Sequence, residues 1–74
     1  MIILLQADWY FSMNAGEDCE SQVIEVFDTE EEYQQYLKDN HITDRQFDRN
    51  YIMGEEPRDN QWLSWYYTQR LDAS

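Results

Sequence analysis

Apolar and polar residues alternate along the first part of the chain. In the stretch from Ile2 to Phe11, one side carries Ile3, Leu5, Ala7, Trp9 and Phe11, and the other carries Gln6, Asp8 and Tyr10. This period of two, with its β-branched and aromatic residues, predicts a strand. A second apolar stretch, Gln22 to Phe27, predicts a strand that pairs antiparallel with the first. Residues 12–20 lack periodic apolar residues, so we expect a loop there.

The middle of the chain carries two helix-start signals. Thr29 and Glu32 form the pattern of a capping box, in which each side chain meets the other residue's backbone amide. An apolar stripe at helical spacing follows, which predicts a helix to about Asn40. Thr43 and Gln46 repeat the capping-box pattern and predict a short second helix over Asp44 to Asn50.

The last third of the chain predicts a hairpin. Tyr51 to Met53 ends at Gly54, and turn-forming residues continue to Asn60. Gln61 to Leu71 is compatible with helix or strand, but its aromatic residues and period-two apolar face favour a strand. We therefore expect it to pair with Tyr51 to Met53.

These elements predict one small α+β domain spanning residues 1–74. The expected order is ββααββ, with two hairpins in an antiparallel sheet and a main and a short helix on one face. A chain of 74 residues has a small core, and twelve aromatic residues help to fill it. The lone Cys19 excludes an internal disulfide, and the apolar start of the chain is too short for a signal peptide or membrane span. We expect a cytoplasmic protein.

Charge is distributed unevenly along the sequence. The net charge is −11, from sixteen acidic and five Lys or Arg residues. Residues 1–40 hold ten acids and one base, a balance of −9, and residues 41–74 hold six acids and four bases, a balance of −2. Solubility requires less charge than this, and self-repulsion at −11 lowers stability. We expect the first forty residues to form an acidic pole of the molecule. Such a pole repels nucleic acid and anionic membranes and attracts basic surfaces.

Half of the acids fall within Glu17 to Glu32, a stretch without Lys, Arg or His. The helix dipole accounts for Glu30, Glu31 and Glu32 in the first helical turn, with Asp28 beside them. It does not account for four further acids in the predicted loop and second strand, which we expect near the helix start: Glu17, Asp18, Glu20 and Glu25. The stretch is either a solvated acidic face or a contact surface.

A contact surface of this charge favours a basic protein partner. Carboxylates can occupy a groove whose Lys and Arg residues otherwise bind phosphates, and the resulting association is salt-sensitive. The leading hypothesis is an inhibitor that occupies a nucleic-acid-binding surface, and phage proteins that block restriction or CRISPR complexes are similar in size and charge. An immunity protein or antitoxin for a basic nuclease or toxin is the alternative. A third class is a structural oligomerisation module, with the aromatic terminal hairpin as a homodimer interface.

The partner-binding residues follow from this hypothesis. Trp62 and Tyr66 point away from the apolar face of their strand and are candidate aromatic anchors. The full prediction is Glu17, Asp18, Glu20, Glu25, Asp28, Glu30, Glu31, Trp62 and Tyr66. Glu32 is assigned to the helix cap.

Catalytic, cofactor and metal sites are not expected. No calcium-loop spacing is present. His41 follows the first helix and is expected to interact with its end. The acids around Cys19 disfavour its thiolate. We expect a protein that is not an enzyme and binds neither cofactor, metal, nucleic acid nor membrane.

Overall fold

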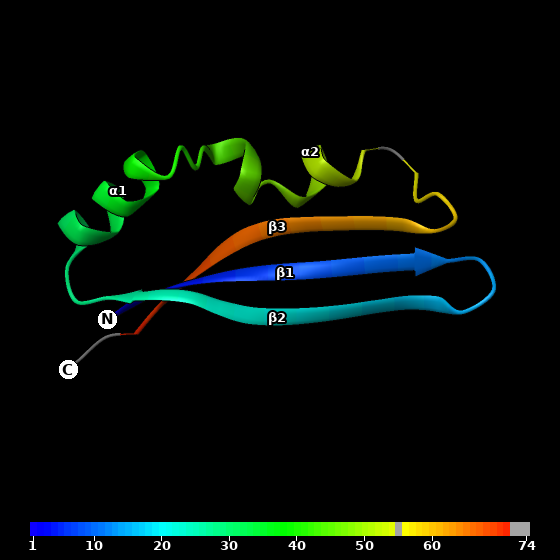
Figure 1. Cartoon of the computed structure of the whole chain (residues 1–74), viewed down its shortest axis with the longest axis horizontal. Coiled ribbons are helices and arrows are strands. Elements are labelled where there is room, and N and C mark those ends of the chain that lie inside the picture. Colours follow the sequence, from blue (N-terminus) through cyan, green and yellow to red (C-terminus); the bar gives the residue numbers. More distant parts are fainter. Residues whose placement is uncertain (55, 72–74) are drawn as a thin grey trace.

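The computed structural model describes residues 1–54 and 56–71 and contains one three-stranded antiparallel sheet (Figure 1). Strand β1 spans Ile2–Ser12, β2 spans Gly16–Phe27 and β3 spans Gln61–Arg70. The strand order is β2-β1-β3, so β1 pairs with both neighbours. The two N-terminal strands and their antiparallel pairing are confirmed, as is the strand at Gln61 to Leu71.

A β-bulge divides β2 into two parts. Leu4 pairs with Glu25 and the next residue, Leu5, pairs with Val23, so Ile24 is the extra residue. Successive side chains of a strand point to opposite faces, and an extra residue reverses which face each later side chain occupies. Glu20 therefore lies opposite Asp8 and shares its face of the sheet.

Helix α1 spans Glu30–Asp39 at the predicted position, but of the expected capping box the hydrogen bonds of the described residues include only the half made by Thr29. The Thr29 hydroxyl accepts a hydrogen bond from the backbone amide of Glu32 at 3.2 Å. The helix ends in a Schellman motif, because the amide of His41 bonds the carbonyl of Lys38 and the amide of Ile42 bonds that of Leu37. His41 occupies the left-handed position with φ of 56°.

The expected second hairpin is wrong. Residues 44–53 form two short helices, the 3₁₀-helix η1 at Asp44–Phe47 and α2 at Arg49–Met53, so the order is ββ, helices, β. The Asp48 carboxylate caps α2 by accepting from the amides of Asn50 and Tyr51, which commits Tyr51 to Met53 to a helix. β3 pairs with β1 instead.

The main core lies between the sheet and α1. Ile2, Leu4, Phe27 and Tyr33 are buried together, and Leu4 is fully inaccessible to solvent. The even-numbered residues of β1 point to this side, which we call the helix face; the odd-numbered residues point to the opposite face.

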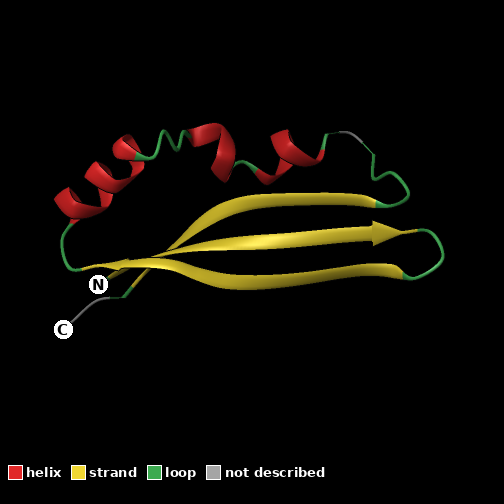
Figure 2. Cartoon of the chain, in the orientation of Figure 1, coloured by secondary structure: helices red, strands yellow, loops and turns green. Residues whose placement is uncertain are grey.

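The helical segment follows the β3 side of the sheet (Figure 2). The ring of Phe47 contacts that of Tyr66 on the helix face in a tilted arrangement, whereas the Arg49 guanidinium lies 5.4 Å from the ring centroid of Trp65 on the opposite face. The segment thus reaches around the outer edge of β3.

The molecule is flat and elongated. Its extents are 44 × 24 × 16 Å and its radius of gyration is 14.5 Å, against about 11 Å for a compact domain of this length. Much of β1 and β2 therefore has no helix packed on it. None of the helices in the described part of the chain has the length and apolar character needed to cross a membrane.

Candidate functional site: an acidic hollow beneath Trp62

The acids predicted in a loop lie in strand β2. The turn is shorter than expected, at residues 13–15, and Glu17, Asp18 and Glu20 pair with Phe11, Tyr10 and Asp8. They show no apolar periodicity because this part of the edge strand is exposed on both faces. Ten residues separate Glu17 from the end of β2, which is roughly 33 Å of strand. The expectation that these acids lie beside the helix start is therefore wrong for Glu17, Asp18 and Glu20.

The pairing of the strands instead gathers three acids and two aromatic rings around one hollow. Asp8 and Tyr10 of β1, Asp18 and Glu20 of β2, and Trp62 of β3 surround it. The hollow has a volume of about 130 Å³. We call it the acidic hollow. It occupies the half of the helix face that α1 does not cover, at the turn end of the sheet.

Hydrogen bonds hold the floor of the acidic hollow in place. The Ser64 hydroxyl donates to the Asp8 carboxylate at 2.6 Å, and the Gln6 amide donates to the same oxygen at 3.4 Å. The Tyr10 hydroxyl donates to the side-chain oxygen of Asn60 at 2.7 Å. Asp8 and Tyr10 therefore present fixed groups, while Asp18 and Glu20 are exposed.

Trp62 forms the aromatic wall of the hollow. It is 67% exposed, although its ring contacts that of Tyr10 with centroids 5.7 Å apart. An exposed indole next to carboxylates is the environment that attracts a Lys or Arg side chain, through cation–π contact with the ring and charge-assisted hydrogen bonds to the acids.

The acidic hollow opposes folding electrostatically. Asp8 and Glu20 are directly opposite each other across β1 and β2, and Asp18 is two residues from Glu20 on the same face. Like charges placed directly opposite on paired strands destabilise a sheet. Local features that conflict with stability are characteristic of functional positions.

Tyr66, the other predicted aromatic anchor, lies elsewhere. It is half-buried, contacts the tilted ring of Phe47 with centroids 5.9 Å apart and packs against the main core. Its ring therefore contributes to the contact between β3 and the helical segment.

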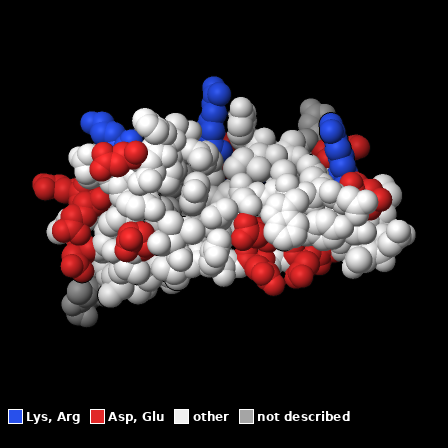
Figure 3. Space-filling view, viewed as in Figure 1, with Lys and Arg blue, Asp and Glu red and all other residues white. Residues whose placement is uncertain are grey.

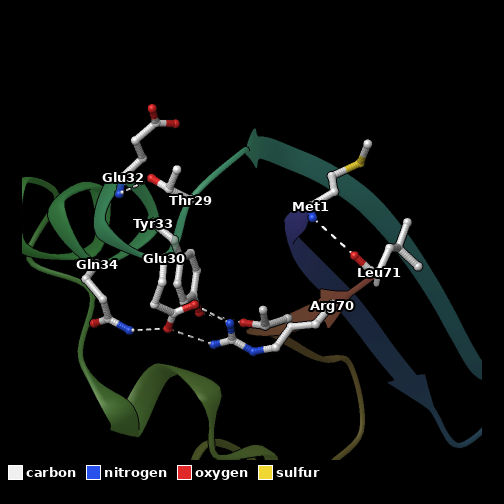
Figure 4. A network of polar contacts seen from close by, with 9 residues as sticks. Met1, Thr29, Glu30, Glu32, Tyr33, Gln34, Arg70 and Leu71 are labelled. Atoms are coloured by element: carbon white, nitrogen blue, oxygen red, sulfur yellow. Dashed lines mark hydrogen bonds and ion pairs between the residues drawn. The ribbon is translucent and has the colours of Figure 1, made fainter. Parts of the chain in front are cut away.

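Glu30 is engaged within the fold. It forms an ion pair with Arg70 at the end of β3 and accepts a hydrogen bond from Gln34 at 3.1 Å (Figure 4). The Arg70 hydrogen bond lowers the pKa of the Glu30 carboxyl, with a smaller contribution from Gln34. Arg70 also lies over the ring of Tyr33, 5.4 Å from its centroid. This network ties α1 to β3.

The remaining predicted acids are exposed but do not line the hollow. Glu25 accepts from the amide of Val26 at 3.1 Å, and Glu17 accepts from the Trp9 indole at 3.1 Å on the opposite face. Asp28 and Glu31 flank the start of α1. The nine predicted residues thus fall into separate groups, of which Asp18, Glu20 and Trp62 come together.

The basic residues belong to elements other than β1 and β2, but Arg49 shares a hollow with Trp9 of β1 and with Glu17, Asp18 and Cys19 of β2. Lys38 and Arg45 lie in α1 and η1, Arg49 in α2, Arg58 in the loop before β3 and Arg70 at its end. In the space-filling view of Figure 3, blue atoms follow the helical side, and red atoms gather at the α1 end and along the β2 side. The acidic hollow therefore has no basic residue on either of the two strands that supply its acids.

No set of three or more His, Cys, Asp or Glu side chains within residues 1–54 and 56–71 is arranged to hold a metal ion. Cys19 is a free, exposed thiol on the opposite face. His41 meets the end of α1 through its backbone amide.

Asp8 and Tyr10 were not predicted as site residues. They belong to the polar side of the first strand, where the sequence shows only regular alternation. Their role depends on which residues β2 and β3 place beside them.

No protein-family model matches the sequence, and comparisons with curated proteins and with solved structures gave no significant match.

Proposed function

We propose that the protein is a non-catalytic inhibitor that binds a basic surface of a larger, nucleic-acid-binding protein, as anti-restriction and anti-CRISPR proteins do. The acidic hollow takes one Lys or Arg side chain of that surface. The observation that carries the proposal is that Asp8, Asp18 and Glu20 line one hollow with the exposed ring of Trp62.

The size of the hollow favours a single side chain as its ligand. Pockets for small molecules and cofactors have volumes of about 300–1,000 Å³, whereas this hollow has about 130 Å³. A guanidinium or ammonium group needs little space and gains from both carboxylates and an aromatic face.

The rest of the acidic surface would guide the partner to the hollow. Glu17 and Glu25 on β2, and Asp28 and Glu31 at the α1 start, extend the negative potential along one side of the molecule. Such a field accelerates association with a basic partner and makes it sensitive to salt. We place this interaction in the cytoplasm.

Capture from a cell lysate tests the proposal. The wild-type protein, D18K/E20K and D28K/E31K are immobilised, and the retained proteins are identified at low and at high salt. The two double variants change the net charge equally. Basic nucleic-acid-binding proteins should bind the wild type at low salt, bind D28K/E31K less strongly than the wild type and fail to bind D18K/E20K.

Competition with nucleic acid then tests the inhibitory step. Added duplex DNA or RNA should displace the captured protein if both ligands occupy one surface. Retention that is indifferent to salt, or equal capture by all three proteins, would contradict the proposal. Capture of a basic toxin that nucleic acid does not displace would instead support an immunity protein or antitoxin.

A further inference from the structure

Exposed apolar side chains gather on the opposite face of the sheet. Eight large hydrophobic residues are exposed among the described residues, and five of them lie together at the α1 end of that face: Met1, Val23, Val26, Tyr67 and Leu71. We call this the apolar patch. The others are separate, at Met13, Tyr51 and Trp62.

Strand register places these residues on one surface. Val26 pairs with Ile3, and Val23 and Tyr67 flank Leu5 from the two sides. Met1 and Leu71 extend the ladder through reciprocal backbone hydrogen bonds of 3.1 and 2.9 Å. Ile3 and Leu5 are half-buried in the middle of the patch.

The opposite face is almost free of charge. Its strand positions are occupied by Ile3, Leu5, Ala7, Trp9, Phe11, Val26, Val23, Ser21, Cys19, Glu17, Gln69, Tyr67, Trp65, Leu63 and Gln61. The one charged residue among them, Glu17, is at the turn end and bonds Trp9, and Arg49 of α2 lies over Trp65 near that end. The α1 end, which carries the apolar patch, has no charged strand position on this face, so in a chain of net charge −11 the patch is complementary to an uncharged apolar surface.

We infer that the apolar patch is the interface of a face-to-face homodimer. A second copy supplies the uncharged apolar surface that the patch requires, and a two-fold axis lets the same residues meet each other. Sheets pack about 10 Å apart. The acidic hollows then lie on the two outer faces, separated by more than the Debye length of about 8 Å at physiological salt.

The size of the patch predicts a weak dimer. Three strands at about 4.8 Å and seven residues, Met1 to Ala7, at about 3.3 Å give a footprint of roughly 330 Å² per copy. This is at the low end of the roughly 300–600 Å² that the largest apolar patch of a monomer covers, and it is below the approximately 800 Å² per partner of a standard interface. We therefore expect a dimer that forms only at high protein concentration.

Sedimentation of the full chain between about 5 and about 500 μM tests the inference in the concentration range of a weak interface. The wild type should shift from monomer to dimer as its concentration rises. V23E, which adds a carboxylate to a side chain that is 58% exposed in the patch, should raise the dissociation constant at least about tenfold. M13E is the matched control, because it adds the same charge at a 73% exposed residue outside the patch, and it should change the constant less than about twofold.

Salt and spectroscopy separate this interface from other modes of association. Salt should strengthen the dimer, because it screens repulsion between two acidic copies. Dilution should change the backbone NMR signals of β1 to β3 residues on the patch. Circular dichroism checks that V23E remains folded, and Y67S serves as the second variant if it does not. A monomer at every concentration, or a dimer that weakens equally in V23E and M13E, would overturn the inference.

Discussion

At the scale of single residues, Asp8 and Glu20 place two like charges at directly paired positions of β1 and β2. Like charges at such positions destabilise a sheet. Ser64 and Gln6 bond the Asp8 side of the pair, but neither carries a charge that could offset the repulsion. The partner binding that we propose gives these acids a role that folding does not supply.

We predict that E20Q is more stable than the wild type. The substitution keeps the shape of the side chain and removes one of the opposed charges, so the free energy of unfolding should rise by about 0.2–1 kcal/mol. Chemical denaturation of E20Q and the wild type at low salt measures this change in the free energy of unfolding. E31Q is the control, since it removes a charge that favours the first turn of α1 and should be neutral or destabilising. A loss of stability in E20Q would show that the carboxylate supports the fold.

A second residue-scale prediction concerns His41. Its φ of 56° places a side chain in the left-handed region that glycine adopts most easily. H41G should therefore stabilise the protein by up to about 1 kcal/mol. H41A removes the imidazole but retains Cβ, so it should not share the gain. Equal stability of H41G and H41A in thermal unfolding would contradict the backbone explanation.

At the scale of elements, the β-bulge at Ile24 determines which acids meet. Without the extra residue, Cys19 and Ser21 would lie on the helix face beside Asp8 and Tyr10. With it, Asp18 and Glu20 lie there, and the opposite face receives Cys19 and Ser21. One inserted residue thus concentrates charge on one face of β2 and removes it from most of the other.

The ion pair between Glu30 and Arg70 makes the docking of α1 dependent on pH. The pKa of Glu30 is lowered in the folded protein from its ordinary value of 4.5, chiefly by the Arg70 hydrogen bond. Its stabilising contribution is therefore present above pH 4.5 and is lost as the pH falls through the lowered pKa.

We predict that E30Q is less stable than the wild type near neutral pH and that the difference shrinks below pH 4.5. Thermal unfolding of both proteins at neutral pH and below pH 4.5 measures this difference in stability. E31Q is the control, because it removes a first-turn charge and leaves Arg70 paired with Glu30. A difference between wild type and E30Q that stays constant with pH would exclude the ion pair as its cause.

The sequence predicted β1 and α1 from their regular apolar stripes, and the Thr29 hydroxyl caps α1 as expected. It did not predict that the main core uses Ile2 and Leu4, because the apolar stripe of β1 is its odd-numbered side. Residues 16–21 form an edge strand exposed on both faces, so no apolar pattern distinguishes them from a loop. The helix at Tyr51 to Met53 did carry a signal, since Asp48 precedes it as a cap and Gly54 follows it.

The candidate site was predictable in composition but not in arrangement. Asp18, Glu20 and Trp62 follow from local charge and aromatic character. Asp8 and Tyr10 join them only because β1 is central and β2 contains a bulge, and both properties depend on long-range pairing. The ion pair of Glu30 with Arg70 joins residues forty positions apart and was not predictable from helix-start signals.

At the scale of the whole molecule, the flat shape gives the protein two different surfaces. The helix face beyond α1 carries the acidic hollow, and the opposite face carries the apolar patch at the other end of the sheet. A homodimer through the patch would leave both hollows exposed, so one assembly could engage two basic side chains. Salt should weaken partner binding and strengthen the dimer.

The central claim is that the acidic hollow binds basic side chains. NMR titration of the isotopically labelled protein with a short arginine-rich peptide tests it directly, with W62A as the comparison. We expect saturable changes that are largest at the Trp62 indole N–H and at Asp8, Asp18 and Glu20, and much weaker binding by W62A. Changes of equal size at Asp28 and Glu31, or equal affinity of W62A and the wild type, would contradict the account.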